Sequence, residues 1–155
     1  MKTAAAWAIA FIAKHNEDLA QKVVDIDGVD YLVACVQEPE IKLKRIAAGC
    51  LSEICKHNES LARKVVEAQA VGFIAALIIH PDDQLKRQVL SCLAQISKHS
   101  SSLAEGVVEA SIFPRMLTCL KEQDHVVRKN AANCMREIAR QSPELSKIIS
   151  NAGGE

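Results

Sequence analysis

Aromatic residues are scarce in this chain of 155 residues, which contains one Trp, one Tyr and three Phe. Glycine and proline are also few, with six and four residues, whereas Ala, Leu, Ile and Val are plentiful. A composition rich in aliphatic residues and poor in turn-forming residues favours packed helices over a sheet. The sequence therefore predicts an all-α fold.

An excess of charge of either sign is missing too, because 19 Lys and Arg residues balance 19 Asp and Glu residues. No overall field attracts nucleic acid or a membrane surface. A nucleic-acid site would also need aromatic side chains between basic ones, and most of the few aromatics fall at core-like positions. With no signal-like start and no long apolar run, we expect a cytoplasmic protein that binds neither nucleic acid nor membrane.

Motifs for catalysis or metal binding are absent as well. The sequence has no Gly-rich phosphate loop, no CxxC pair, and no motif that ties a Ser, Cys or acid to a histidine. Three of the six cysteines, Cys50, Cys92 and Cys134, are equally spaced, at a position where the first copy of a repeat has Ala8. We expect them to be buried, reduced thiols. The sequence predicts no catalytic residue, no metal, no cofactor and no small-molecule substrate.

One eight-residue stretch recurs at 12–19, 54–61 and 96–103, and in weaker form at 138–145. The interval between copies is constant, and a fixed period of about 42 residues indicates a stacked repeat array. We divide the chain into a partial repeat (1–15), three repeats (16–57, 58–99 and 100–141) and a second partial repeat (142–155). Both ends fall inside a repeat, so we expect residues 1–155 to be a single array cut from a longer one.

The repeat from Asn58 to His99 predicts three helices. Asn58 is a good N-cap for a short helix that ends near Ala68, and Ser142 with Pro143 repeats this signal in the last copy. After a break at Gln69, a strongly apolar helix covers 72–79 and is stopped by Pro81. The third helix is the longest.

Apolar residues of the third helix step by three and four, as one buried helical face requires. In the second copy the stripe is Leu43, Ile46, Ala47, Cys50, Leu51 and Ile54; in the first it is Ala4, Ala5, Ala8, Ile9 and Ile12; in the third it is Leu85, Val89, Cys92, Leu93 and Ile96. Gln88 and Asn130 replace Ile46 in later copies. We expect these two amides at the edge of the packed face, because burial without partners would cost about 1–3 kcal/mol each.

A three-helix repeat with this period and a break at 27–29 resembles the armadillo repeat over the whole chain. HEAT repeats fit less well, because they have two helices and the segment 58–68 is separately capped. The resemblance implies an α-solenoid, a right-handed superhelix, whose third helices line a concave groove that binds extended partners.

Several segments are similar to armadillo proteins of the ciliary central apparatus. They are 5–8, 12–16, 23–25, 37–41, 43–48, 112–114, 117–121 and 151–154. This resemblance implies a non-catalytic scaffold on the microtubules of a cilium or flagellum axoneme, in the cytoskeleton, that is needed for motility. Its expected partners are central-apparatus proteins, with tubulin as a further candidate.

A helical wheel of the third helices places basic residues opposite the apolar stripe. The candidate groove residues are Trp7, Lys14, Arg45, Lys56, Arg87, Lys98, Lys129, Asn133, Arg136 and Arg140. The wheel puts Ser52 and Ala94 on the same face, and acidic residues collect in the first helices and the connectors. One hypothesis is that this stripe binds an acidic extended segment. The alternative is an ordinary solvated helix face.

Nuclear-import adaptors also resemble this repeat, but they bind basic signals with a ladder of Trp and Asn in successive repeats. The two corresponding columns here read Trp7, Gly49, Ser91, Asn133 and Phe11, Glu53, Gln95, Glu137. Because the ladder is absent and the groove is basic, we do not expect an import adaptor.

A column of histidines, His15, His57 and His99, invites a catalytic interpretation. Each follows a Lys at the end of a third helix, where a donor can meet unpaired carbonyl groups. We therefore predict a capping role for them.

Overall fold

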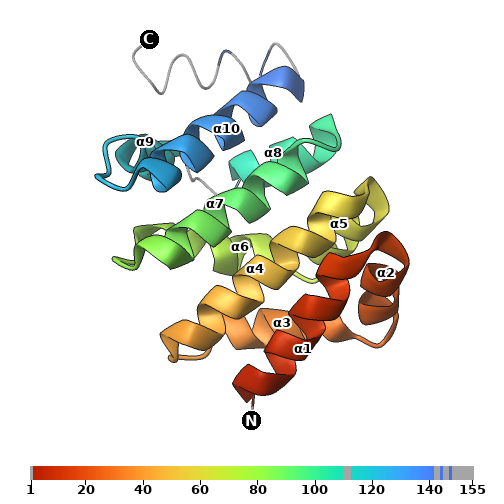
Figure 1. The fold of residues 1–155 in the computed structure, drawn as a ribbon. Helices are drawn as coiled ribbons and strands as arrows, with labels where there is room; N and C mark the ends of the chain where they lie inside the picture. Colours follow the sequence, from red (N-terminus) through yellow and green to blue (C-terminus); the bar gives the residue numbers. More distant parts are fainter. Residues whose placement is uncertain (1, 110–112, 142–143, 145–146, 148–155) are drawn as a thin grey trace.

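In a computed structural model, residues 2–109, 113–141, 144 and 147 are described, and every regular element among them is a helix (Figure 1). The helices are α1 (Lys2–His15), α2 (Glu17–Asp25), α3 (Gly28–Val36), α4 (Ile41–His57), α5 (Glu59–Glu67), α6 (Ala70–Ala76), η1 (Leu77–Ile79), α7 (Asp83–Ser97), α8 (Ser101–Glu109), α9 (Phe113–Cys119) and α10 (His125–Gln141). The predicted all-α solenoid is confirmed.

The third helix of each unit packs against the third helix of the next, so α1, α4, α7 and α10 form one layer (Figure 1). The shorter helices lie behind this layer, with α2, α5 and α8 along one side of the molecule. Each short helix also packs against the long helix of its own unit, as α3 does against α4. The layer of third helices thus presents one continuous face.

The predicted cap at Asn58 is confirmed. Its Oδ1 accepts a hydrogen bond from the Leu61 backbone N–H at 2.8 Å, and Asn16 does the same for Leu19 at 2.9 Å. Each cap satisfies one of the donors that the first turn of a helix leaves unpaired. The equivalent signal at 142–143 lies outside the described residues.

The break between the first and second helices is made by one residue in the left-handed region. Asp27 has φ 61° and Gln69, one repeat later, has φ 66°. A single residue of this kind changes the direction of the chain, and the next helix begins directly after it. As a result α6 begins at Ala70, earlier than the predicted 72, and its last turn tightens into the 3₁₀ segment Leu77–Ile79.

The apolar stripe is confirmed in α4 and α7, where Leu51, Ile54, Leu93 and Ile96 are fully buried. In α1 the prediction is wrong for most of the stripe, since Ile12 is 41% exposed and the predicted alanines at 4, 5 and 8 are exposed. The physical reason is that α4 packs between two third helices, whereas α1 packs against one. The two amides lie at the edge, as predicted: Gln88 is exposed, and Asn130 Nδ2 donates to the Arg87 carbonyl at 3.0 Å.

The cysteines Cys50, Cys92 and Cys134 are buried, as their position in the repeat predicts. Removal from water raises the pKa of the Cys50 thiol to about 12, with smaller contributions from Glu53 and neighbouring thiols. Burial also raises the pKa of Cys134. These thiols therefore behave as small apolar side chains in the core.

Candidate protein-binding groove

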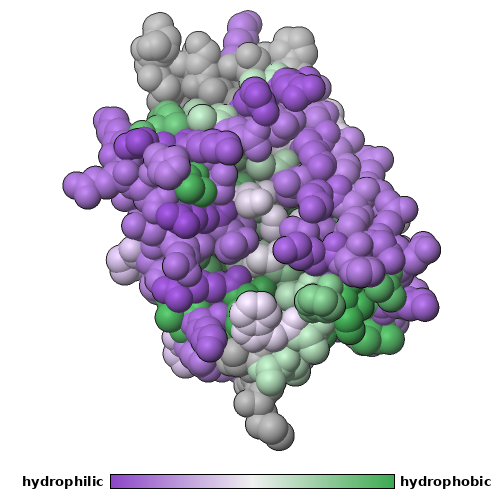
Figure 2. Space-filling model, viewed as in Figure 1, coloured by the Kyte–Doolittle hydropathy of each residue, from purple (hydrophilic) through white to green (hydrophobic). Residues whose placement is uncertain are grey.

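The candidate residues lie in two rows on the face formed by the third helices. The N-terminal row contains Arg45, Arg87 and Lys129, and the C-terminal row contains Lys14, Lys56, Lys98 and Arg140. Between the rows runs a central column of Trp7, Gly49, Ser91 and Asn133. On this face, a paler strip crosses the third helices between two hydrophilic margins (Figure 2).

The two arginines of the N-terminal row are paired with carboxylates of the following unit. Arg45 Nε donates to Asp82 Oδ1 at 2.9 Å, and Arg45 Nη2 contacts Asp82 Oδ2. Arg87 repeats this arrangement with Asp124, with an Nε–Oδ1 distance of 3.2 Å. Such forked pairs are stronger and more directional than single contacts. The charge of these arginines is therefore already engaged within the array.

The same two carboxylates cap the next third helix. Asp82 Oδ1 accepts the Leu85 N–H at 2.8 Å, and Asp124 Oδ1 accepts the Val127 N–H at 3.0 Å. The hydrogen bond from Arg87, with help from the Val127 N–H, lowers the pKa of Asp124 to about 2. Arg45 likewise lowers the pKa of Asp82. Both aspartates thus stay ionised and bound to two neighbours at once.

The cations of the C-terminal row are paired less strongly than the two arginines of the N-terminal row. Lys56 Nζ lies 3.0 Å from Glu53 Oε1, and Arg140 Nη1 lies 3.5 Å from Glu137 Oε1, each pair within one helix. In both pairs the basic side chain is exposed and the carboxylate is part-buried, and pairs within one helix contribute only about 0.3–0.5 kcal/mol. Lys14 and Lys98 are exposed and form no salt bridge with another described residue.

Three further candidates meet on α10. Lys129, Asn133 and Arg136 line one hollow of about 410 Å³. Arg136 Nη2 donates to Asn133 Oδ1 at 2.6 Å, which fixes the guanidinium over the helix. Three predicted residues thus lie together on this part of the face.

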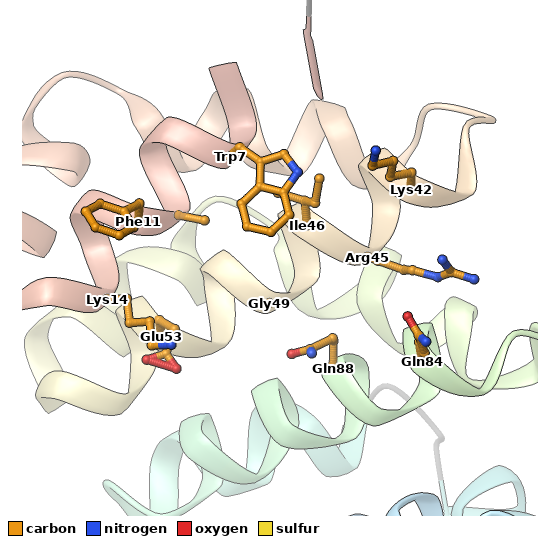
Figure 3. Close-up of a pocket in the computed structure, with 11 residues that line it drawn as sticks. Trp7, Phe11, Lys14, Lys42, Arg45, Ile46, Gly49, Glu53, Gln84 and Gln88 are labelled. Carbon is orange, nitrogen blue, oxygen red and sulfur yellow. The ribbon is translucent and has the colours of Figure 1, made fainter. Parts of the chain in front are cut away.

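A second hollow, of about 480 Å³, lies between α1, α4 and α7 (Figure 3). Trp7 and Ile46 stand on one side of it, Gln84 and Gln88 on the other, and Gly49 lies between them. Sequence reasoning placed Trp7 on the groove face but missed the hollow. The available signal was the pair Trp7 and Gly49, which occupy one column of the repeat and differ greatly in size.

Two residues that the wheel assigns to the groove are instead buried between third helices. Ser52 is 5% exposed, and its Oγ lies 2.9 Å from Ser91 Oγ of the next unit. Ala94 is 3% exposed. A wheel of one helix misses this burial because α4 and α7 each have neighbours on two sides.

The histidine column forms links between units. His57 Nε2 lies 2.9 Å from the Ala13 carbonyl and His99 Nε2 lies 2.6 Å from the Cys55 carbonyl. A carbonyl oxygen can only accept, so Nε2 carries the proton in both. Gln141 takes this role in the fourth copy and donates to the Lys98 carbonyl at 2.9 Å. The predicted capping of helix-end carbonyls is confirmed for His57 and His99, but the carbonyl belongs to the preceding third helix. His15 is exposed.

The described residues contain no group of three His, Cys, Asp or Glu side chains placed to hold a metal ion. Over the same residues, no helix combines the length and the apolar character that crossing a membrane would need.

Comparison with known proteins agrees with this architecture. A HEAT-repeat family model matches residues 112–142. Over 97% of the chain, a designed armadillo repeat protein superposes with a TM-score of 0.94 at 19% sequence identity. The chain has an armadillo/HEAT-like repeat fold.

Two further solved structures resemble this armadillo/HEAT-like array. An engineered protein matches 98% of the chain at 26% identity with a TM-score of 0.94. A designed armadillo repeat protein in complex with the peptide (KR)4 matches 97% at 22% identity, also with a TM-score of 0.94. The array spans 62% and 63% of the length of these two chains. None of the curated proteins compared with it matches.

Proposed function

We propose that this array is a non-catalytic scaffold that binds an acidic, extended segment of a partner protein across its third helices. The observation that carries the proposal is the C-terminal row, where successive third helices each present an exposed cation. Carboxylates of the partner would pair with Lys14 and Lys98 directly and would displace the weak intrahelical partners of Lys56 and Arg140.

The dimensions of the face suit an extended chain. Packed helices lie about 8–10 Å apart, so four third helices span about 24–30 Å between their axes. An extended chain rises about 3.3 Å per residue, so about eight or nine residues would cross all four. Gly49 and Ser91 in the central column leave room for a backbone to approach.

The sign of the charge distinguishes this groove from that of a designed relative. One designed armadillo repeat protein is in complex with (KR)4, a basic peptide. Here the exposed row is basic, and a basic segment would be repelled, whereas an acidic one would be attracted.

A charge reversal of the C-terminal row tests the proposal. The triple variant Lys14→Glu, Lys56→Glu, Lys98→Glu should bind a dye-labelled peptide of alternating glutamate and serine at least about tenfold more weakly by fluorescence anisotropy. Lys22, Lys64 and Lys121 are exposed and lie outside the groove, so reversing these three gives a control of equal net charge. Equal affinity for both variants, insensitive to salt, would sink the proposal.

We further propose that the array belongs to a microtubule-associated component of the axonemal central apparatus, needed for flagellar motility. The resemblance of segments such as 12–16 and 43–48 supports this place, and the acidic tails of tubulin have the chemistry that the basic row would bind. A tagged full-length chain in a ciliated cell should concentrate on central-pair microtubules. Enrichment at nuclei or cell junctions would instead favour an armadillo adaptor for acidic segments in another compartment.

A further inference from the structure

Two large aromatic side chains stand exposed at one end of the groove. Trp7 is 57% exposed and Phe11 is 72% exposed, and they lie one helical turn apart on α1. Both line the hollow of about 480 Å³ between α1, α4 and α7. The apolar surface of this hollow is therefore open to the same face as the two charged rows (Figure 3).

Gly49 forms the middle of this hollow, although it lies inside the 17-residue helix α4. Glycine is the least favourable residue inside a helix apart from proline. Packing of the backbone does not require it here, because a Cβ at this position would meet only the end of the Gln88 side chain, at 3.2 Å from Oε1. The lack of a side chain at Gly49 keeps the hollow open beside Trp7.

The charges around the hollow indicate which side chains can enter it. Lys14 and Lys42 line it together with one carboxylate, Glu53, and with Arg45, whose charge is paired with Asp82. The lysines would repel a cationic side chain. A neutral apolar side chain could pack against Trp7, and acidic residues on either side of it in the peptide could pair with the lysines. Gln84 and Gln88 offer amide groups on the opposite side for hydrogen bonds to a peptide backbone.

We propose that this hollow is an anchor pocket for one aromatic side chain of the acidic segment that the groove binds. The inference rests on the proposed function and deepens it: the ligand is an acidic extended peptide with an aromatic residue at one fixed position. The ring stacks against Trp7 over Gly49, while carboxylates before and after it meet the exposed cations of the C-terminal row. Anchors of this kind dominate the affinity of many interfaces.

The test compares two dye-labelled peptides of alternating glutamate and serine that differ at one central position, Phe in one and Ala in the other. The wild-type array should bind the Phe peptide at least about tenfold more tightly. Trp7→Ala, which removes an exposed ring, and Gly49→Leu, which fills the hollow, should each bring this ratio close to one. Gly106 in α8 has open space around its Cβ position, so Gly106→Leu is the matched control and should leave the ratio unchanged.

Trp7 is the only Trp in the chain, so its fluorescence reports on the pocket directly. The Phe peptide should shift the Trp7 emission at saturation, and the Ala peptide should not. If both peptides bind equally, or if Trp7→Ala keeps the full ratio, the anchor pocket is wrong while the proposed function stands. If neither peptide binds, the proposed function itself falls, and the pocket with it.

Discussion

The guanidinium of Arg45 holds the carboxylate of Asp82, which at the same time caps the first turn of α7. One unit thus supplies the cation and the next supplies the anion and the helix that the anion caps. The pair Arg87 and Asp124 repeats the arrangement between α7 and α10. Contacts between neighbouring units make a repeat array unfold cooperatively, because each unit is stabilised by its neighbours.

A double-mutant cycle with Arg45→Gln and Asp82→Asn should measure a stabilising coupling energy. Asn caps a helix about as well as Asp does, so the cycle isolates the ion pair from the cap. The control is the exposed pair Arg63 and Glu59 within α5, whose atoms lie 3.1 Å apart. Urea denaturation should give a larger coupling energy for the Arg45 pair, and an equal or smaller one would contradict the structural role.

Acid should destabilise the array in part through Asp124. Because its folded-state pKa is lowered to about 2, below the value of about 3.9 in an unfolded chain, its stabilisation is present above pH of about 4. That stabilisation is lost as the pH falls towards 2. The variant Asp124→Asn should therefore lose less stability than the wild type between pH of about 4 and 2 in thermal unfolding. Parallel losses over this range would contradict the prediction.

Replacing His57 tests the link to the preceding third helix. His57→Leu should lower the free energy of unfolding by about 1 kcal/mol, because the Ala13 carbonyl loses its donor. His57→Gln should keep most of the stability, since Gln141 makes the same contact in the fourth copy. His15 is exposed, so His15→Leu serves as the control and should have little effect. Equal losses for the Leu and Gln variants of His57 would show that the hydrogen bond does not contribute.

Thiol labelling should report the burial of the cysteines. All six are buried, and burial raises the pKa of the thiols of Cys50 and Cys55, so little thiolate is present at pH of about 8. Iodoacetamide should modify almost none of them in the folded protein and all six after denaturation, as counted by intact mass. Rapid labelling of one thiol in the folded state would place that cysteine on an accessible surface.

The constant period of the repeat was sufficient to predict the helical architecture, since it aligned the caps and stripes of successive units. It also placed His57 at a helix end. The contact with Ala13 could not be predicted in this way, because the two residues are not separated by one period and so do not occupy equivalent positions of the repeat. The pair Arg45 and Asp82 could have been noticed, because Arg87 and Asp124 are separated by the same stretch of sequence. The burial of Ser52 could not have been predicted from the sequence, because it depends on how closely α4 and α7 approach each other.

Two junctions between third helices, α4 with α7 and α7 with α10, are tied at both ends, by an arginine–aspartate pair near the N-termini and by a histidine or glutamine contact near the C-termini. Two separated links at each of these junctions resist both sliding and twisting of one unit against the next. The spacing between binding positions is then set before any ligand binds, so the array loses little conformational freedom on binding. We therefore expect a partner to match this interval in its own sequence.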